Sequence, residues 1–159
     1  VRRLKEEADV ADRIDASSYT PLDAGLFGAS ADFDPNDLPA LVSGLAGQIE
    51  QLRHEPVSAA ELDKARANFL AAEHWERESV SGQARKLGTF ELLAGDASRE
   101  AEYLSRVAAA TPVDLLEVAR RWLIPERALL GAVLPEDTRV DEDALRDLIK
   151  ACSKAGWGV

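Results

Sequence analysis

Two short segments near the start of the chain alternate between apolar and polar residues, and they constrain the fold most. In Val10–Thr20, Ile14 and Ala16 fall on one face of an extended chain, with charged and hydroxyl residues on the other. Leu26–Phe33 follows as a second strand, after Pro21–Gly25, whose proline, aspartate and glycine favour a turn. The two strands are therefore predicted to pair as an antiparallel hairpin.

The segment after the hairpin has the spacing of a helix. Apolar residues recur every three or four positions over residues 38–52, and Asp34–Asp37 supplies candidate capping groups before them. Two small residues within this stripe, Gly44 and Gly47, are expected to let the helix approach a sheet closely.

A second helix is predicted to begin at a capping box. Ser58 and Glu61 have the spacing at which hydroxyl and carboxylate satisfy each other's free backbone amides. We expect the helix to bend near Ser81–Gly82 and to run on to Leu93, before Gly95 stops it. Its predicted apolar stripe consists of Leu62, Ala65, Phe69 and Ala72.

Three further helices are predicted. One covers Arg99–Ala108, and the next begins at Pro112 behind a Thr111 cap, with Asp114 facing the helix dipole. The last begins at Asp141. The predicted buried stripes are Leu115, Val118, Ala119 and Trp122 in one, and Leu145, Leu148, Ile149 and Cys152 in the other.

A late apolar run completes the pattern and suggests the fold class. Ala128–Leu134 is continuously apolar, which is typical of a covered strand, and it would have to return beside the hairpin to be buried. This order predicts an α+β fold, a two-layer sandwich with an antiparallel or mixed sheet and helices packed on one face. A purely helical bundle is the alternative, and it would require Val10–Phe33 to be helical.

Charge and length exclude several classes of protein. The 159 residues suit one domain, and 19 basic against 29 acidic residues give a net charge of −10, which disfavours binding to nucleic acid or anionic lipid. No apolar run approaches the roughly 20 residues that span a bilayer, so we expect a soluble protein. Cys152 is the one cysteine and allows no internal disulfide, which suits cytoplasm and periplasm alike.

No group of residues forms a convincing catalytic or metal site. The two histidines, His54 and His74, lie 20 positions apart. Glu73, His74 and Glu78 form a local metal-like grouping in which His74 and Glu78 share a helix face at i,i+4 spacing, but a solvated charged surface explains them better. Ser17–Thr20 is hydroxyl-rich and is interpreted as the polar end of a strand. The three tryptophans are expected to pack in the core or the tail; they are Trp75, Trp122 and Trp157.

Several motifs together resemble the second domain of a half-molecule of the pitrilysin/insulinase family of zinc peptidases, which includes the mitochondrial processing peptidases. Their order and spacing are more specific than any one of them. The motifs are Leu4–Glu7, Ser17–Pro21, Gly25–Phe27, Pro56–Ala65, Ser79–Gly88, Gly95-Asp96, Ala109–Asp114 and Val133–Glu136.

The resemblance implies a chamber of two halves that encloses an unfolded peptide, with zinc bound elsewhere by an H-x-x-E-H helix of the first domain. The other half contributes an arginine and, seven positions later, a tyrosine that contact the substrate. Lys5 and Asp12 stand at those two positions, so neither matches. We therefore assign no catalytic, metal-binding or substrate-binding residue to this chain.

The predicted function is that of a non-catalytic structural domain. It would form part of the peptide-enclosing chamber of a zinc metalloendopeptidase and support an H-x-x-E-H domain, in cis or on a partner chain. Zinc is expected in that neighbouring domain and not in this one. Residues 1–7 resemble the last turns of a helix, so residues 1–159 are expected to be a single domain of a larger peptidase. The alternative is a stand-alone module that binds extended peptide along the edge of Leu26–Phe33, or an assembly module without peptidase activity.

Overall fold

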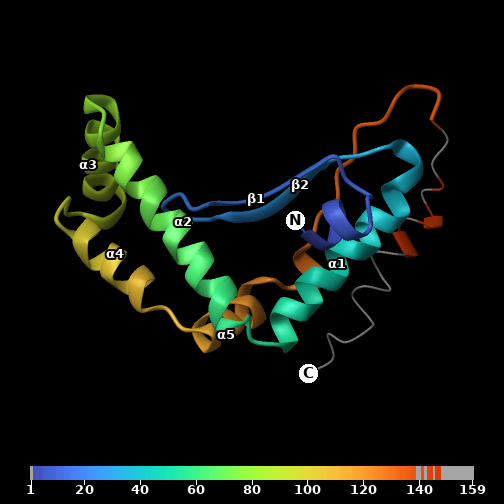
Figure 1. Ribbon diagram of the computed structural model, residues 1–159. Coiled ribbons are helices and arrows are strands. Elements are labelled where there is room, and N and C mark those ends of the chain that lie inside the picture. Colours follow the sequence, from blue (N-terminus) through green and yellow to red (C-terminus); the bar gives the residue numbers. More distant parts are fainter. Residues whose placement is uncertain (1, 139–140, 142, 145, 148–159) are drawn as a thin grey trace. The chain divides into compact units, whose positions relative to one another are not determined.

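The computed structural model describes residues 2–138, 141, 143, 144, 146 and 147. It is mostly helical with one two-stranded sheet (Figure 1), so the predicted α+β class is confirmed, while the sandwich layering stays a prediction. The elements are η1 (Arg2–Glu7), β1 (Arg13–Tyr19), β2 (Leu26–Asp32), η2 (Pro35–Asp37), α1 (Leu38–His54), α2 (Ala59–Arg77), α3 (Val80–Ala94), α4 (Arg99–Ala109), α5 (Pro112–Trp122) and η3 (Pro125–Arg127).

The chain divides into two compact units. Unit 1 comprises Val1–Thr20, Gly25–Glu55 and Glu117–Val159, and unit 2 comprises Pro21–Ala24 and Pro56–Leu116. The single domain predicted for residues 1–159 stays a prediction. None of the helices in the described part of the chain is long and apolar enough to cross a membrane.

The predicted hairpin is confirmed. β1 and β2 pair in antiparallel register from Arg13 opposite Asp32 to Tyr19 opposite Leu26. Because side chains alternate between the faces of a sheet, the register gives one mainly apolar face and one polar face. The apolar face consists of Ile14, Ala16, Ser18, Phe27, Ala29 and Ala31. Among the polar-face residues are Arg13, Asp15, Ser30 and Asp32.

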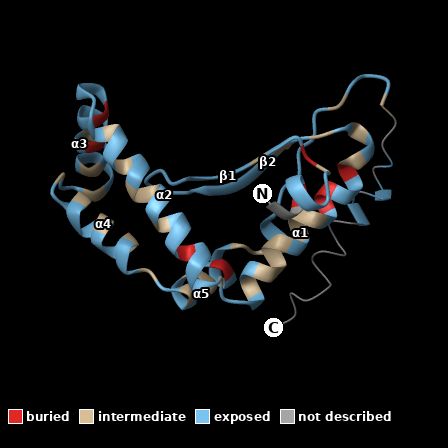
Figure 2. Cartoon of the chain, in the orientation of Figure 1, coloured by how far each residue is buried: buried red, intermediate tan, exposed pale blue. Residues whose placement is uncertain are grey.

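The core of unit 1 lies at one end of the hairpin. Leu4 of η1, Ala11 and Leu41 of α1 are buried, and Ile14 and Ala31 pack against them. Figure 2 shows buried positions on α1, whereas β1 and β2 are almost entirely exposed. Only the beginning of β1 and the end of β2 are therefore held by the core.

The two glycines of α1 have different surroundings. A Cβ at Gly44 would lie 2.3 Å from Cδ2 of Leu4, so this glycine lets η1 approach α1. A Cβ at Gly47 would have no neighbour within 4 Å. The prediction that both serve contact with a sheet is wrong, because the close neighbour at Gly44 is a side chain of a helical turn.

The predicted late strand is also wrong. Ala128–Leu134 has no strand structure, and Leu129 and Val133 are 96% and 97% exposed. A strand is defined by hydrogen bonds to a neighbour, and within the described residues β1 and β2 pair only with each other. An apolar run without such a neighbour remains irregular.

The long bent helix predicted after Ser58 is in fact two helices. α2 ends at Arg77 and α3 begins at Val80, with Ser79 as the N-cap of α3. The predicted stripe of α2 is half right, because Leu62 and Phe69 point inward whereas Ala65 and Ala72 are exposed.

The predicted burial of Trp75 and Trp122 is wrong, whereas the predicted cap of the last helix is supported. Trp75 and Trp122 are 73% and 62% exposed, so their predicted core packing is wrong, and Val118 is exposed as well. The cap at Asp141 is supported, because its Oδ1 accepts a hydrogen bond from the Ala144 amide at 2.9 Å. The residues of the buried stripe predicted for the last helix lie outside the described residues: Leu145, Leu148, Ile149 and Cys152. Trp157 also lies outside them.

Both predicted helix starts are confirmed as reciprocal caps. The Glu61 amide donates to Ser58 Oγ at 3.2 Å, and the Ser58 amide donates to Glu61 Oε2 at 3.1 Å. At α5 the Asp114 amide donates to Thr111 Oγ1 at 3.2 Å, and the Thr111 amide donates to Asp114 Oδ2 at 2.8 Å. The hydrogen bond from the Thr111 hydroxyl, followed by that from its amide, lowers the pKa of the Asp114 carboxyl.

We predict that this cap is lost in acid. A carboxyl whose pKa is lowered by folding stabilises the fold above its usual value of 3.8, and the contribution disappears as the pH falls through the lower, folded value. Asp114→Asn should therefore unfold at lower urea concentration than the parent at pH 7, and the difference should shrink at pH 3. The matched control is Asp23→Asn at an exposed position in the hairpin loop, which should change the urea midpoint at pH 7 less than Asp114→Asn does. A difference for Asp114→Asn that stays constant between these pH values would contradict the assignment.

Candidate functional site

The sharp turn between α2 and α3 is the best-defined polar arrangement in the described part of the chain. The chain leaves α2 at Glu78, and the Ser79 hydroxyl oxygen accepts a hydrogen bond from the Gly82 amide at 3.0 Å. This bond satisfies one of the free amides at the start of α3. The Gln83 side chain donates to the Arg77 carbonyl at 2.9 Å, which ties α3 back to the end of α2.

Gly82 is required by the close approach of the two helices. A Cβ at this position would lie 1.9 Å from the Glu76 carbonyl oxygen and 2.9 Å from its carbon. Both atoms belong to the backbone, so they cannot rotate away as the end of a side chain can. The turn therefore accepts glycine and excludes larger residues.

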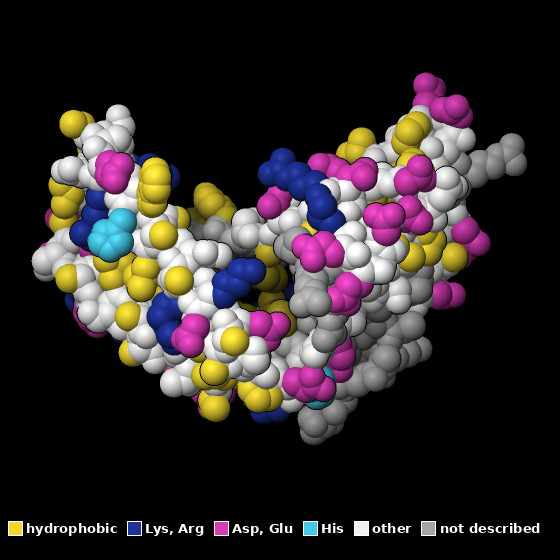
Figure 3. All heavy atoms as spheres, viewed as in Figure 1, with side chains coloured by type: hydrophobic (Ala, Val, Ile, Leu, Met, Phe, Trp, Pro, Cys, Tyr) yellow, Lys and Arg dark blue, Asp and Glu magenta, His cyan; other side chains and the backbone are white. Residues whose placement is uncertain are grey.

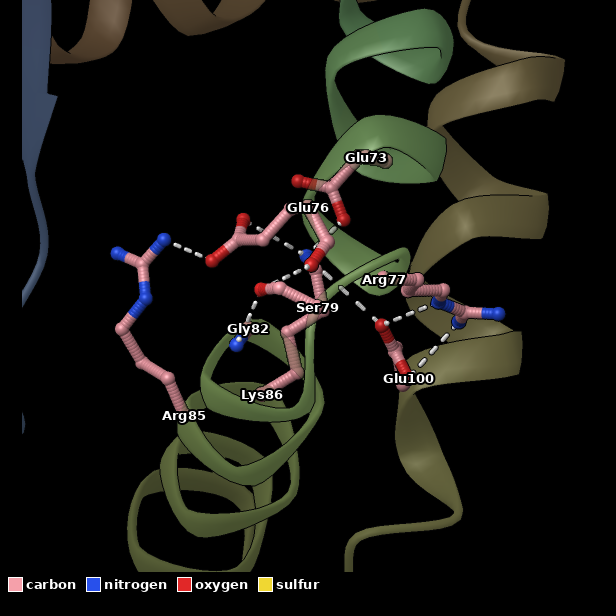
Figure 4. Close-up of polar contacts among 8 residues, drawn as sticks. All are labelled: Glu73, Glu76, Arg77, Ser79, Gly82, Arg85, Lys86 and Glu100. Carbon is pink, nitrogen blue, oxygen red and sulfur yellow. Dashed lines mark hydrogen bonds and ion pairs between the residues drawn. The ribbon is translucent and has the colours of Figure 1, made fainter.

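Lys86 lies one turn further along α3 and is buried among three carboxylates (Figure 4). Its ammonium group donates to Glu73 of α2, lies 3.4 Å from Glu76 Oε2 and 3.8 Å from Glu100 Oε1 of α4. The residue is 8% exposed. One cation therefore connects α2, α3 and α4.

Two arginines complete the charge balance. Arg77 pairs with Glu100 at 2.8 Å, and Arg85 pairs with Glu76. The cluster of Lys86, Arg77, Arg85 and the three glutamates, here called the Lys86 cluster, has three positive and three negative groups. A buried ion pair is compatible with folding only when its partners are present and well placed, because each isolated charge would be costly.

An aromatic group adjoins the Lys86 cluster. The Tyr103 ring contacts Phe69 with centroids 6.1 Å apart, and Phe90 with centroids 5.7 Å apart. Burial raises the pKa of the Tyr103 phenol, the Glu73 carboxylate adds to the rise and Lys86 opposes it. Aromatic packing and ion pairs therefore connect the same three helices, α2, α3 and α4.

The geometry of the Lys86 cluster suits a structural role. Each of the three carboxylates is engaged by a cation, which leaves none positioned as a base beside an open site. In residues 2–138 and the described positions beyond them, no three histidine, cysteine, aspartate or glutamate side chains are arranged to hold a metal ion.

The residues considered as a metal site do not come together. Glu73 turns to Lys86, whereas His74 and Glu78 are exposed. His54 pairs instead with Glu50 of its own helix, with Nε2 2.8 Å from Oε1. The interpretation of this surface as solvated charge therefore fits His74 and Glu78 but misses the role of Glu73.

The two positions at which the resemblance implies substrate contact are occupied differently here. The Lys5 ammonium donates to the Asp12 backbone carbonyl, so the two residues contact each other at the entry to β1. The lysine thereby satisfies a backbone acceptor of its own chain.

The comparison with protein families bears on these positions directly. Residues 1–69 match the family model described as the peptidase M16 inactive domain. The predicted resemblance is confirmed. The M16 inactive-domain match extends from η1 through the hairpin and α1 into α2. The Ser79–Gly88 motif, which builds the Lys86 cluster, lies beyond the matched residues. A comparison with curated proteins gave no match.

Sequence reasoning missed Lys86 as a buried residue. The available signal was the pair Glu73 and Glu76 on the inward side of α2, where Phe69 also lies. Two carboxylates on an inward stripe require a cation, and Lys86 follows within the next helix. A charged residue on a helix is nevertheless more often solvated, which explains why the pattern was assigned to the surface.

We predict opposite effects for two substitutions within α3. Gly82→Ala should lower the free energy of unfolding by about 2 kcal/mol, because the new methyl group overlaps the Glu76 carbonyl. Gly88→Ala meets nothing within 4 Å and should raise it by up to about 1 kcal/mol, since alanine favours helices. Urea unfolding followed by circular dichroism measures both. Equal effects of the same sign would contradict the proposed close approach.

We also predict that the Lys86 cluster depends on its central cation. Lys86→Met should destabilise the chain by about 2 kcal/mol, because three neighbouring carboxylates lose their shared partner while water partly screens them. Lys64→Met, at an exposed position of the same unit, should change stability by less than about 0.5 kcal/mol. Similar urea midpoints for the two variants would show that the cluster contributes nothing to stability.

Proposed function

We propose that this chain is a non-catalytic structural domain of a pitrilysin-type zinc metalloendopeptidase. In this proposal it forms part of the chamber that encloses a polypeptide substrate, and it supports a separate domain with the H-x-x-E-H motif. That domain would lie on the same polypeptide or on a partner chain, and it would hold the zinc ion.

The match of residues 1–69 to the M16 inactive domain is the observation on which the proposal depends. The matched part contains the η1 turn, the hairpin and α1, which together build the core of unit 1. A domain described as inactive implies that it associates with an active domain of the same family. The two histidines of the sequence, His54 and His74, do not stand in an H-x-x-E-H motif, as the proposal requires.

The exposed apolar residues of unit 1 support a role in a larger assembly. Leu26 and Phe27 of β2 are 71% and 52% exposed, and Leu129 and Val133 are almost fully exposed. Leu26 and Phe27 turn to opposite faces of the hairpin, so exposed apolar groups lie on both of its sides, and exposed apolar groups are typical of surfaces that another part of an assembly covers. A supporting domain would have such a surface where it adjoins its neighbour.

Charge supports a preference for basic or amphipathic substrates. The sequence has a net charge of −10, and Figure 3 shows many acidic side chains on the visible face of unit 1. If this face lines the chamber, long-range attraction would concentrate positively charged peptides there.

The experiment combines the purified chain with a zinc-bearing M16 domain encoded by the same genome. The chain alone should contain no stoichiometric zinc and should not cleave an internally quenched peptide. On size-exclusion chromatography the two proteins should elute together as a complex with one zinc per pair. The His54→Ala/His74→Ala double variant serves as the control for adventitious metal, and its zinc content should equal that of the parent.

Two results would overturn the proposal. One tightly bound zinc per isolated chain, lost in the double histidine variant, would place a metal site within this chain. Separate elution of the two proteins at concentrations of tens of micromolar would remove the supporting role.

A further inference from the structure

The apolar side chains of α3 face outward, away from the helices that it contacts. Its inner side carries Gly82, Lys86 and Phe90, which lie at the spacing of one helix face and contact α2 and α4. Figure 2 shows the rest of α3 as mostly exposed. Three large apolar residues on the outward side are 85%, 55% and 81% exposed: Val80, Leu87 and Leu92. This distribution is the reverse of that in a typical surface helix, whose apolar stripe faces its own core.

Small residues lie between these large ones. Ala84 follows Val80 by one turn, and Gly88 precedes Leu92 by one turn. Among the described residues, a Cβ at Gly88 would have no neighbour within 4 Å. Glycine inside a helix costs stability relative to alanine, and no contact between α3 and the other described elements offsets that cost here. A gap of this kind lets a further helix approach α3 closely, because the distance between two helix axes depends on the side chains at their contact.

The charges on this side of α3 favour one orientation of a second α3 helix. Glu91 lies on the outward side, whereas Arg85 at its border is already paired with Glu76. Two α3 helices side by side in parallel would place one Glu91 against the other, and like charges repel. In the antiparallel orientation Glu91 would instead lie opposite Ser81, whose hydroxyl can donate a hydrogen bond to a carboxylate.

The antiparallel orientation also matches side chains by size. With the two helices crossing at residues 85–87, Val80 of one lies opposite Leu92 of the other, and Ala84 lies opposite Gly88. The large residues thus meet at the two ends and the small ones at the crossing. Two-fold symmetry repeats each of these contacts, as in an interface formed by the same surface of two copies. Opposed helix dipoles add a favourable term.

We propose that the outer face of α3 binds the same face of a second copy of this chain as an antiparallel helix pair. The outer face of α3 consists of Val80, Ser81, Ala84, Leu87, Gly88, Glu91 and Leu92. The self-complementarity of this face in size and charge identifies the second copy as its partner. This dimer goes beyond the proposed function, since it requires neither zinc nor a catalytic domain. It leaves the expected ratio of one zinc-bearing domain per chain unchanged.

The test is sedimentation equilibrium of the full 159-residue chain at concentrations from about 5 to about 500 µM. We expect the mass to rise from 17.2 kDa toward twice that value, with a dissociation constant on the order of 100 µM, because a single helix pair is a small interface. Each copy carries a net charge of −10. Association should therefore become tighter as the salt concentration rises from about 50 to about 500 mM, since salt screens the repulsion between copies.

Three variants locate the interface. Gly88→Gln fills the gap at the crossing and should weaken association at least about tenfold, although glutamine favours the helix more than glycine does. Ser81→Glu places a carboxylate opposite Glu91 of the second copy and should also weaken association about tenfold. The matched control is Thr89→Glu, which makes the same charge change at an exposed position beside the outer face and should weaken association less than about threefold. Circular dichroism and urea unfolding check that each variant folds.

Four outcomes would overturn the inference. The first is a chain that remains monomeric at about 500 µM. The second is association that Gly88→Gln leaves unchanged, which would place the interface elsewhere. The third is equal weakening by Ser81→Glu and Thr89→Glu, which would show that net charge alone controls association.

The fourth outcome concerns the other possible partner of this face. If the chain is monomeric and Gly88→Gln prevents co-elution with a zinc-bearing M16 domain, the outer face of α3 binds that domain and the proposed dimer is wrong. Zinc content and co-elution of the unmodified chain with the zinc-bearing domain are measured separately, so the proposed function can fail or hold independently of the dimer.

Discussion

The burial of one lysine among three glutamates is the interaction on which unit 2 depends most. Its buried residues within the described chain are Leu62, Gly82 and Lys86, and α4 has no buried residue at all. With so little apolar core, the relative positions of α2, α3 and α4 must be fixed by directional contacts. The Lys86 cluster supplies them, and the absence of a Cβ at Gly82 lets α3 come close enough to α2 to form them.

Unit 1 is held together by a different principle. Its core is a small apolar cluster around Leu4, Ala11 and Leu41, which secures one end of the hairpin and leaves the other exposed. Both strands are therefore positioned by the core but not covered by it. This exposure fits the proposed role in a larger assembly, because a neighbouring domain can cover the part of the sheet that the described residues leave exposed. The M16 inactive-domain match includes the hairpin, so the exposed sheet lies in the part of the chain that resembles this family.

Local features of the fold could be predicted from the sequence, whereas features that depend on distant partners could not. The turn at Pro21–Gly25 and the caps at Ser58 and Thr111 each depend on a few neighbouring residues, and all three are found. The late strand at Ala128–Leu134 was predicted from its apolar composition, but a strand also requires an edge to pair with. Local composition cannot supply that information.

The same reasoning explains the errors in burial. Trp75 and Trp122 were assigned to the core because large aromatic residues are usually covered, yet both are exposed in this chain. Lys86 was assigned no special role because lysine is usually solvated, yet it is among the most buried residues of unit 2. In each case the outcome depends on which other elements pack nearby. The H-x-x-E-H motif, in contrast, is a local pattern, and these 159 residues do not contain it.

The central claim is that this chain serves peptide hydrolysis as a framework while another domain performs the chemistry. The most direct test measures kcat/KM for a quenched peptide with a zinc-bearing M16 domain of the same genome, in the absence and presence of a molar excess of this chain. The account predicts little activity for the zinc-bearing domain alone and an increase that saturates at one chain per zinc. Activity that is unchanged by the added chain would contradict it.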